Sequence, residues 1–410
     1  MSGPLTGFRI VDLTSMVSGP LGTMILADQG AEVIKIENPK GGDHTRAVST
    51  RRGGFSAAFL NNNRNKRSVA LNLKDPRGRE LLLRLATGAD VFVQNFRPGV
   101  IERMGLGEDV LREVAPEIVY VSINGFGERG PYAAKPVYDP LVQALSGLTT
   151  IQGGSDQVRP RLVRTILPDK LTGITSAQAI TSALLARERS GKGQHVRLSM
   201  LDSVVAFLWA SDMGSQTFVG GEFPQEETQS FIDLIYQTAD GYISVAVQSD
   251  REWAGLARAL ERPEWLEDQR FKTVVLRQEN IDARLEATQE ALRGWSSADC
   301  LARLEAEDVP CAPILRRRDM IGHPQILANE TVIETEHPQA GHLRQARAAA
   351  RFSETPAQHR HGAPCLGEHT REALTGLGLS AAELDALAAE AVIGLGEPET
   401  VPGPTQGLVP

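Results

Sequence analysis

Residues 7–37 read GFRIVDLTSMVSGPLGTMILADQGAEVIKIE, and the pattern of this stretch changes twice along its length. The segment FRIVDL is short and rich in β-forming residues, and AEVIKIE repeats that character at the far end. Between them Gly19-Pro20 opens a helical stretch that runs through Asp28, and Gly30 ends it. This order of strand, helix and strand predicts a βαβ unit, in which a crossover helix joins two parallel strands.

The same alternation continues through the first half of the chain. Asp75-Pro76 opens a second helix and Gly88 ends it, with Asp75 expected at the N-cap and Pro76 at the first helical position. The strand DVFVQN, the helix LGEDVLREVAP and the strand IVYVSING follow. Residues 1–218 are therefore predicted to form the N-terminal part of a large α/β domain with a mainly parallel sheet. The first strand-to-helix turn, TSMVSGPLG, is not GxGxxG, so we do not predict NAD or FAD binding.

The length of 410 residues predicts more than one domain, because a single hydrophobic core rarely serves so long a chain. A linker is expected at 219–229, where Gly220-Gly221 precedes a charged stretch with Pro224. Beyond it, 230–317 reads as a smaller α+β domain, with short strands around YISVAV and three helices. The tail 396–410 is rich in Gly and Pro without periodicity and is expected to be disordered.

Composition excludes several classes of function. The formal net charge of −8 argues against a nucleic-acid-binding surface. The three cysteines form no CxxC pair and the eight histidines no HExxH pattern, so no metal site is predicted. No GxSxG motif supports a serine hydrolase. The N-terminus lacks the pattern of a signal peptide and no apolar run is long enough for a membrane span, so we expect a soluble cytoplasmic protein with no membrane partner.

Residues 161–199, RLVRTILPDKLTGITSAQAITSALLARERSGKGQHVRLS, place a single acidic residue, Asp169, at the start of a long helix. A Gly-Lys-Gly turn ends that helix and leads into a strand. Two readings of Asp169 stay open at this point. It is either a helix cap, since aspartate at a helix start accepts hydrogen bonds from backbone N–H groups, or a nucleophile.

Basic residues gather in two stretches of this acidic chain. NNNRNKRSVALNLK carries Arg64, Lys66, Arg67 and Lys74, and NFRPGVIERMGL adds Arg97 and Arg103. Such clusters either bind phosphate through charge-assisted hydrogen bonds or form an ordinary solvated face with surface ion pairs. The residue types alone do not decide between these readings.

Several blocks together resemble the class III CoA-transferase (CaiB/BaiF) family, in the family's own order and over nearly the whole chain. They are VDLTSMVSGP, GAEVIKIENPKGGD, NRNKRSVALNLK, VQNFRPGVIERMGL, SINGFGERGPYAAKPVYD, RERSGKGQHV with MLDS, and GAPCLGEHT. The resemblance implies a catalytic aspartate at Asp169, with Tyr138 and Asp139 near the acyl group. It also implies a coenzyme A site formed by Ser15, Met16, Val17, Ser18, Asn38, Leu71, Leu73, Asn95, Phe96, Arg97, Arg103 and Lys135.

The resemblance further implies an activity. Such enzymes exchange CoA between an acyl-CoA donor and a carboxylic acid, here expected to be a small dicarboxylate such as succinate, through an aspartyl anhydride and an aspartyl-CoA thioester. Coenzyme A is then a substrate, and no permanently bound cofactor is expected. Two interpretations of Lys170 and Arg164 stay open from the sequence: one of them binds the second carboxylate of such an acid, or both face solvent. A glycine-rich loop that supplies oxyanion donors in relatives has no counterpart in VAVQSDREW.

Two alternatives stay open. A 2-methylacyl-CoA racemase of the same family would need a histidine base where this chain has Tyr138, whose ordinary pKa of about 10 suits that role poorly. A non-catalytic CoA-binding protein would bind CoA without exchange. The family also implies an interlocked homodimer, with a second linker at 318–342 and a return of the chain to the large domain over 343–395.

Overall fold

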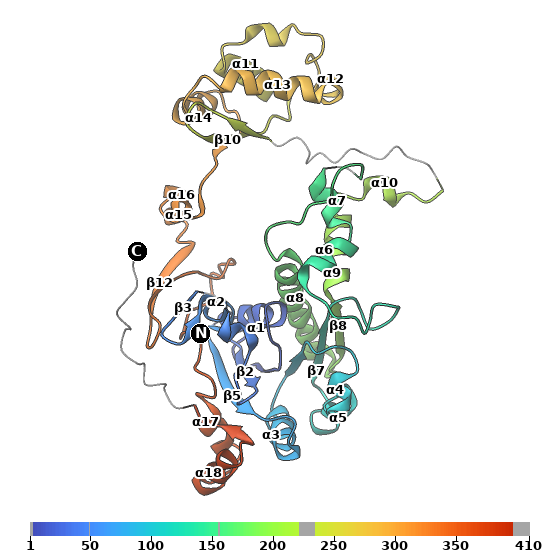
Figure 1. The fold of residues 1–410 in the computed structure, drawn as a ribbon, viewed down its shortest axis with the longest axis vertical. Helices are drawn as coiled ribbons and strands as arrows, with labels where there is room; N and C mark the ends of the chain where they lie inside the picture. The colour runs from blue at the N-terminus through green and yellow to red at the C-terminus, as the bar shows by residue number, and fades with distance from the viewer. Residues whose placement is uncertain (1–2, 49, 155, 221–233, 397–410) are drawn as a thin grey trace. The chain divides into compact units, whose positions relative to one another are not determined.

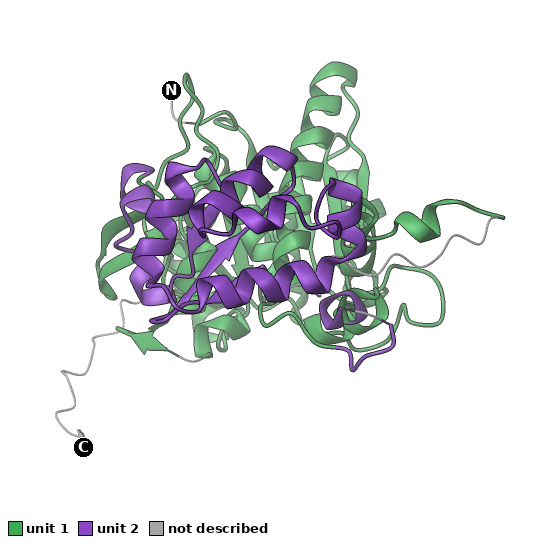
Figure 2. Ribbon diagram, turned by 90° about the horizontal axis from the view of Figure 1, so that it is seen from above, with its two compact units in different colours: residues 1–149, 161–224, 330–410 green, residues 150–160, 225–329 purple. Residues whose placement is uncertain are grey.

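The computed structural model describes residues 3–48, 50–154, 156–220 and 234–396. The chain divides into two compact units, which Figure 2 shows in different colours: one comprises residues 1–149, 161–224 and 330–410, and the other comprises residues 150–160 and 225–329. The predicted linker at 219–229 and the predicted tail at 396–410 lie almost entirely outside the described residues. The domain boundaries given above therefore stay predictions.

The first unit is built on one large sheet (Figure 1). Across the described residues this sheet has seven strands in the order β14-β5-β2-β1-β6-β7-β8. Their bounds are β1 Arg9–Asp12, β2 Glu32–Glu37, β5 Lys66–Leu71, β6 Val91–Gln94, β7 Val119–Asn124, β8 His195–Ser199 and β14 Ile393–Gly394. Only the pairing of β14 with β5 is antiparallel among these strands. The predicted α/β fold with a mainly parallel sheet is confirmed.

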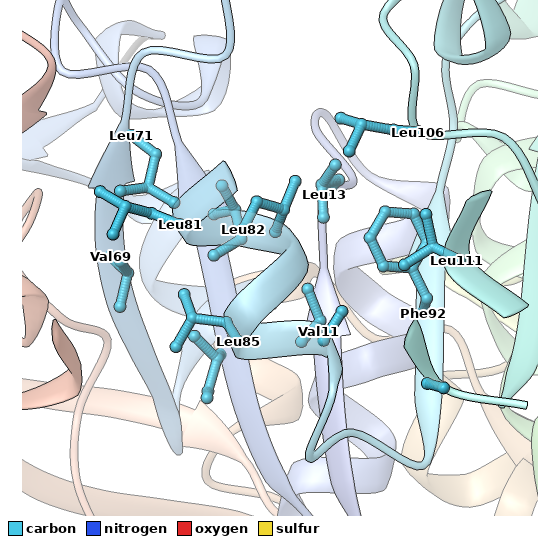
Figure 3. Packing of buried hydrophobic residues seen from close by; sticks show 14 of the residues in the cluster. Val11, Leu13, Val69, Leu71, Leu81, Leu82, Leu85, Phe92, Leu106 and Leu111 are labelled. Carbon is cyan, nitrogen blue, oxygen red and sulfur yellow. The ribbon is translucent and has the colours of Figure 1, made fainter. Parts of the chain in front are cut away.

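Each face of the sheet carries its own hydrophobic core, because successive side chains of a strand point to opposite faces. On β1, Val11 faces a cluster formed with α3 (Pro76–Ala86), α5 (Glu108–Val114), α17 (Thr370–Thr375) and α18 (Ala381–Ala389). Figure 3 shows Val11 in this cluster with Leu82 of α3 and Phe92 of β6. Its neighbour Ile10 packs on the other face, against α1 (Ser18–Asp28) and α8 (Leu167–Ser190).

The strand order reverses at β1, which positions a ligand site. The chain passes from β1 through α1 to β2 on one side, while β6 lies on the other side of β1. In doubly wound sheets the ligand crevice lies outside the carboxyl ends of the strands at such a switch point. The loops that follow β1 and β6 are therefore where the fold favours a binding site.

Helix ends follow the sequence signals. Asp75 caps α3 by accepting a hydrogen bond from the amide of Arg77, with Pro76 as the first helical residue, as predicted. Helix α8 ends at Gly191, whose φ of 69° is a left-handed conformation that glycine adopts without strain. Ser380 and Glu383 form a capping box at the start of α18.

Residues 318–342, expected to be a linker, hold more regular structure than expected. They include α16 (Pro324–Ala328) and β12 (Val332–His337), which pairs with β13 (Gly341–Ala346) in an antiparallel hairpin. The exposure of the side chains alternates from Glu334 to His337, with Glu334 and Glu336 exposed and Thr335 and His337 less so, which is the pattern of a strand with one exposed face. Gly341, with φ of 69°, supplies the conformation that the tight turn needs.

The second unit has its own small sheet and core. Strands β9 (Ile235–Gln237), β10 (Tyr242–Val245) and β11 (Cys311–Pro313) pair antiparallel, and α11 (Asp250–Ala259), α13 (Ile281–Leu292) and α14 (Ser297–Ala306) contribute to a separate hydrophobic cluster. Trp253 stacks on Trp265 in that cluster, with ring centroids 5.4 Å apart. No helix among the described residues is long and apolar enough to cross a membrane.

Candidate active site

Asp169 is the third residue of α8, so it does not stand at the N-cap of its own helix. Ile166 holds the N-cap position, and its apolar side chain cannot accept a hydrogen bond. The amide of Asp169 donates instead to Oδ2 of Asp139, at 3.4 Å. The acceptor for this N–H group therefore comes from another helix, α6 (Asp139–Leu145), and the carboxylate of Asp169 is available for other contacts.

Close packing of α1 against α8 brings the first turns of the two helices together. A Cβ atom at Gly22 of α1 would lie 2.1 Å from Oγ of Ser176, and one at Gly173 of α8 would lie 2.8 Å from the carbonyl oxygen of Ser18. Only glycine fits at these two positions, because real Cβ atoms do not approach other atoms so closely. The crossing places Ser18, the first residue of α1, beside Asp169.

The surroundings of the Asp169 carboxyl group raise its pKa above the ordinary value. Burial is the largest cause, followed by the charge of Asp139, and together they raise the pKa of Asp169 to about 6. The amide and hydroxyl of Ser18 act in the opposite direction, because they favour the ionised form. The amide of Ser18 lies at the N-terminus of α1, where the helix dipole is positive. Near neutral pH the group is thus a half-buried carboxylate with the amide and hydroxyl of Ser18 beside it.

Helix α6 holds the two residues expected near the acyl group in very different environments. Tyr138, at its N-cap position, has 71% of its surface exposed, whereas Asp139 is only 4% exposed. Oδ1 of Asp139 accepts a hydrogen bond of 2.6 Å from Nε2 of Gln143. Burial raises the pKa of Asp139, although the hydrogen bonds from Gln143 and from the amide of Asp169, and the charge of Lys170, oppose that shift.

The loop after β1 is fixed by side chains from two neighbouring strands. Asn95, just past β6, accepts from the amide of Ser15 at 3.0 Å and donates to its carbonyl oxygen at 2.8 Å. Met16 has a φ of 70°, a left-handed conformation that is unfavourable for a residue with a side chain, and its amide donates to Asp43 at 3.2 Å. These bonds hold the chain in the path that leads into Ser18 and α1.

A cavity of about 530 Å³ lies at the carboxyl ends of β1, β2, β5 and β6. Its lining includes these residues of the expected coenzyme A site: Ser15, Asn38, Leu71, Leu73, Phe96 and Arg103. The apolar wall of Leu71, Leu73 and Phe96 suits a flat aromatic ring, and Arg103 with its basic neighbours suits phosphate. The cavity can therefore hold a nucleotide-like group.

The other expected residues are placed elsewhere, although all of them are described. Met16, Val17, Ser18, Asn95, Arg97 and Lys135 do not line this cavity. Val17 lines a separate cavity of about 800 Å³, together with Ile166 and Lys170. Arg97 is exposed, and the ammonium group of Lys135 lies 3.3 Å from the ring centroid of Tyr132.

The basic cluster of residues 64–74 divides between buried ion pairs and the lining of the cavity. Arg64 and Lys66 are buried and form ion pairs with Asp28 and Asp12, so neither open interpretation, a phosphate site or a solvated face, describes these two. The sequence shows the charge of a residue but not that a strand start will turn its side chain inward. Lys74, in contrast, lines the cavity.

Residues that sequence reasoning missed complete the cavity and the carboxyl pair. Lys35, His44 and Arg79 line the cavity, and Gln143 contacts Asp139. Lys35 lies within the predicted strand AEVIKIE, and from that position the sequence could have predicted its place near the carboxyl end of β2. For Gln143 the spacing to Asp139 along one helix face was the signal, since residues four apart are neighbours on a helix.

A second buried aspartate, Asp12, stands at the end of β1 with 0% of its surface exposed. Nζ of Lys66 lies 3.1 Å from Oδ2 of Asp12, and the hydroxyl groups of Thr14 and Thr23 donate to its two oxygens. Burial raises the pKa of Asp12, but the charges of Lys66 and Lys35 with these hydrogen bonds outweigh it and lower the pKa to about 2. Asp12 is therefore a fixed anion beneath the loop.

A doubly wound sheet, a cavity at its switch point and a carboxyl pair beside a helix N-terminus are features of an α/β protein suited to acyl or nucleotide chemistry. The sequence model of CoA-transferase family III matches residues 5–370. The chain belongs to this family and is a CoA-transferase.

Individual relatives agree with this assignment. The chain is 35% identical over 378 residues to human succinyl-CoA:glutarate CoA-transferase, covering 90% of this chain and 85% of the relative. It is 36% identical to acetyl-CoA:oxalate CoA-transferase of Acetobacter aceti, over 81% of this chain and 86% of the relative. Among solved structures, a CAIB/BAIF family protein from Brucella suis superposes with a TM-score of 0.81 at 31% identity, over 92% of this chain and 100% of that one.

Proposed function

We propose that this enzyme transfers CoA from an acyl-CoA to a small dicarboxylic acid, with Asp169 as the covalent nucleophile. The observation that carries the proposal is the setting of Asp169. Its carboxylate is half-buried, it has a second carboxyl group beside it, and the hydroxyl and amide of Ser18 favour its ionised form. A partly desolvated anion of this kind is a better nucleophile than a carboxylate in water.

The proposed reaction proceeds through four covalent exchanges. An oxygen of Asp169 attacks the thioester carbonyl carbon, the C–S bond breaks, and an anhydride and CoA thiolate result. The thiolate attacks the carbonyl carbon of Asp169 and releases the donor acid as its carboxylate, which leaves an aspartyl-CoA thioester. The acceptor carboxylate then attacks this thioester, and the thiolate attacks the acceptor carbonyl of the new anhydride. Asp169 is restored, and no proton or ATP is consumed.

Developing negative charge in these steps needs donors beside the reacting carbonyl groups. The amide of Ser18 at the start of α1 is suited to that role, because its N–H group has no partner inside its own helix. The Ser18 hydroxyl lies beside the same carboxylate. We include Ser18 in the proposal as an oxyanion donor, in place of the glycine-rich loop that this chain lacks.

We place the adenosine end of coenzyme A in the cavity at the switch point, against Leu71, Leu73 and Phe96. Arg103 would bind phosphate there, with Lys74 and Arg79 as further cations of the lining. Ser15 and Asn38 line the same cavity, while Met16, Val17 and Ser18 continue from it toward Asp169. Arg97 and Lys135 remain proposals on family resemblance alone.

The dicarboxylate acceptor is proposed from the relatives, two of which carry glutarate or oxalate in their names. Lys170 suits the second carboxylate: it follows Asp169 directly, is exposed, and donates to the hydroxyl of Thr165 at 2.7 Å. The interlocked homodimer and the cytoplasmic location stay part of this proposal. Light scattering at micromolar concentration tests the dimer, and an active monomer would contradict it.

A trapping experiment tests the nucleophile. The enzyme is incubated with succinyl-CoA without acceptor, treated with hydroxylamine or borohydride, and digested for peptide mass analysis. The label is expected on the peptide that contains Pro168-Asp169-Lys170. A label on Asp139, or no label despite measurable exchange, would overturn the assignment. Mass spectrometry of CoA products from a panel of donor and acceptor acids then identifies the substrates.

A further inference from the structure

Every backbone N–H group in the first turn of α8 has an identified hydrogen-bond acceptor. The amide of Leu167 donates to the carbonyl oxygen of Thr165 at 2.8 Å, Pro168 has no N–H group, and the amide of Lys170 donates to Ile166 at 3.2 Å. The amide of Asp169 is the remaining donor of this turn, and its acceptor is Oδ2 of Asp139. A carboxylate on another helix thus does what an N-cap residue ordinarily does.

The other oxygen of Asp139 is held just as specifically. Nε2 of Gln143 donates to Oδ1 of Asp139 at 2.6 Å and also approaches the carbonyl oxygens of Val163 and Thr165, at 3.3 and 3.4 Å. Oε1 of Gln143 accepts from the amide of Val163 at 2.9 Å. Because the side-chain carbonyl of Gln143 accepts from a backbone N–H group, the side-chain amide cannot rotate by 180°, and its NH₂ group must face Asp139.

Gln143 is 1% exposed, so its hydrogen bonds are made away from water. It connects three parts of the site: the segment that leads into α8, the capping carboxylate, and through that carboxylate the backbone of Asp169. Burying a side-chain amide costs free energy unless its donors and acceptor all form hydrogen bonds. When they do, the hydrogen bonds fix the positions of the groups that the amide connects.

We propose that Gln143 is a positioning residue for CoA transfer: it fixes Asp139 as the cap of α8 and thereby holds Asp169 in place against Ser18. This inference rests on the proposed role of Asp169 as the nucleophile. Gln143 itself touches neither substrate nor the reacting carboxylate. Its expected contribution is to kcat, because it acts on the reacting geometry, while the cavity for coenzyme A is lined by other residues.

Two variants test the proposal. Gln143→Met keeps the length of the side chain but removes every hydrogen bond. Gln143→Glu keeps the acceptor for Val163 and replaces the donor with an oxygen that faces Asp139. Gln143→Met should lower kcat by about 10- to 100-fold at all pH values, the loss expected when a hydrogen bond to a charged group is removed, and Gln143→Glu should show a loss of this size only above neutral pH. KM for acyl-CoA should stay within about twofold of wild type in both.

The pH profile separates positioning from mere support of the fold. In Gln143→Glu a single proton shared between the new carboxyl and Asp139 can replace the lost donor, so kcat should fall as the pH rises above neutrality, where the wild-type rate is flat. The groups that face this proton are Asp139, Asp169 and Lys170. Gln178→Glu is the matched control, because Gln178 is exposed on α8 and donates to nearby Ser182 on the same helix. Its profile should match wild type.

The outcomes are distinct. Unchanged kcat in both variants, an equal rise in KM for acyl-CoA, or a Gln143→Glu profile with the wild-type shape would overturn the inference. Circular dichroism and thermal melting establish that Gln143→Glu is folded. If wild-type Asp169 is not labelled in the trapping experiment, the proposed function fails; if it is labelled and the Gln143 variants are fully active, only the positioning role fails.

Discussion

Asp12 and Asp169 are aspartates of the same unit, and they differ both in burial and in partners: Asp12 is fully buried, whereas Asp169 is half-buried. Asp12 is surrounded by Lys66, Lys35 and two threonine hydroxyl groups, which lower its pKa to about 2. Asp169 has a second carboxyl group and Ser18 as neighbours, and its pKa is raised to about 6. Because the more deeply buried aspartate has the lower pKa, the comparison teaches that charged and hydrogen-bonding partners can outweigh burial in setting the pKa of a carboxyl group.

Replacing Asp169 with asparagine is expected to have the largest effect. Asn keeps the size and the acceptor oxygen toward Ser18 but cannot form the anhydride, so CoA exchange should fall at least about 1,000-fold, as when other covalent nucleophiles are removed. The variant should be no less stable than wild type at neutral pH, because a buried charge beside Asp139 is removed. Exchange assays and chemical denaturation measure the two quantities.

This variant also decides whether Asp169 acts only as a structural partner for the start of α1. A purely structural acceptor would leave the folded Asp169→Asn enzyme near its normal rate. Retention of substantial exchange by the variant would therefore remove Asp169 from the chemistry and leave the Ser18 contact as its whole role.

Replacing Asp12 with asparagine should have the opposite effect on stability. It leaves Lys66 buried without its counter-charge, a change that typically costs about 3–5 kcal/mol of unfolding free energy. Urea denaturation measures that loss. Thr14→Val is a useful companion, since it removes one hydrogen bond to Asp12 and leaves the ion pair. A neutral or stabilising Asp12→Asn would break the contrast between the two aspartates.

The same contrast marks what the sequence could predict. The strands, α1 and α3 follow from local periodicity and from caps such as Asp75, so they were predictable. Asp169 was found through resemblance over several blocks. The Asp169–Ser18 contact was not predictable, because it depends on Gly22 and Gly173 meeting across two helices that are distant in sequence.

Charge misled the sequence analysis for a physical reason. Lys66 was grouped with exposed cations, yet it is the first residue of β5 and its ammonium group lies within the pairing distance of Asp12. The role of Gln143 was missed for the same reason: its partners at Val163 and Thr165 are separated from α6 by a long loop. Local patterns predict elements, whereas buried polar contacts depend on how those elements meet.

Arg103→Ala tests the coenzyme A cavity apart from the carboxyl pair. If Arg103 contacts phosphate, its loss should raise KM for acyl-CoA by an amount equivalent to about 1.5–3 kcal/mol and change kcat little. Arg112→Ala is the control, because Arg112 pairs with Glu108 on one helix face. Equal KM values in the two variants would exclude Arg103 from the binding site.

The smallest effect is expected from pH, and its sign differs between the two aspartates. Asp169 reacts as the carboxylate, so with a pKa of about 6 the rate should fall about tenfold between its plateau and pH 5. Asp139→Asn should shift this acid limb to lower pH, because the charge that helps to raise the pKa of Asp169 is gone. An acid limb that stays in place would show that the two carboxyl groups are not coupled.

Stability should respond to pH in opposite directions at the two sites. The folded-state pKa of Asp169 lies above its ordinary value of 3.8, so the folded protein binds the proton more tightly and this group's contribution to stability declines as the pH rises from about 4 to 6. Asp12 has a folded-state pKa below 3.8, so its contribution is present above that pH and is lost as the pH falls toward 2. Unfolding free energies of wild type, Asp169→Asn and Asp12→Asn, measured from pH 4 to 7, isolate the contribution of Asp169. The difference between wild type and Asp169→Asn should change across this range. The difference between wild type and Asp12→Asn should stay nearly constant. If neither difference changed with pH, the opposite pKa shifts inferred for Asp12 and Asp169 would be contradicted.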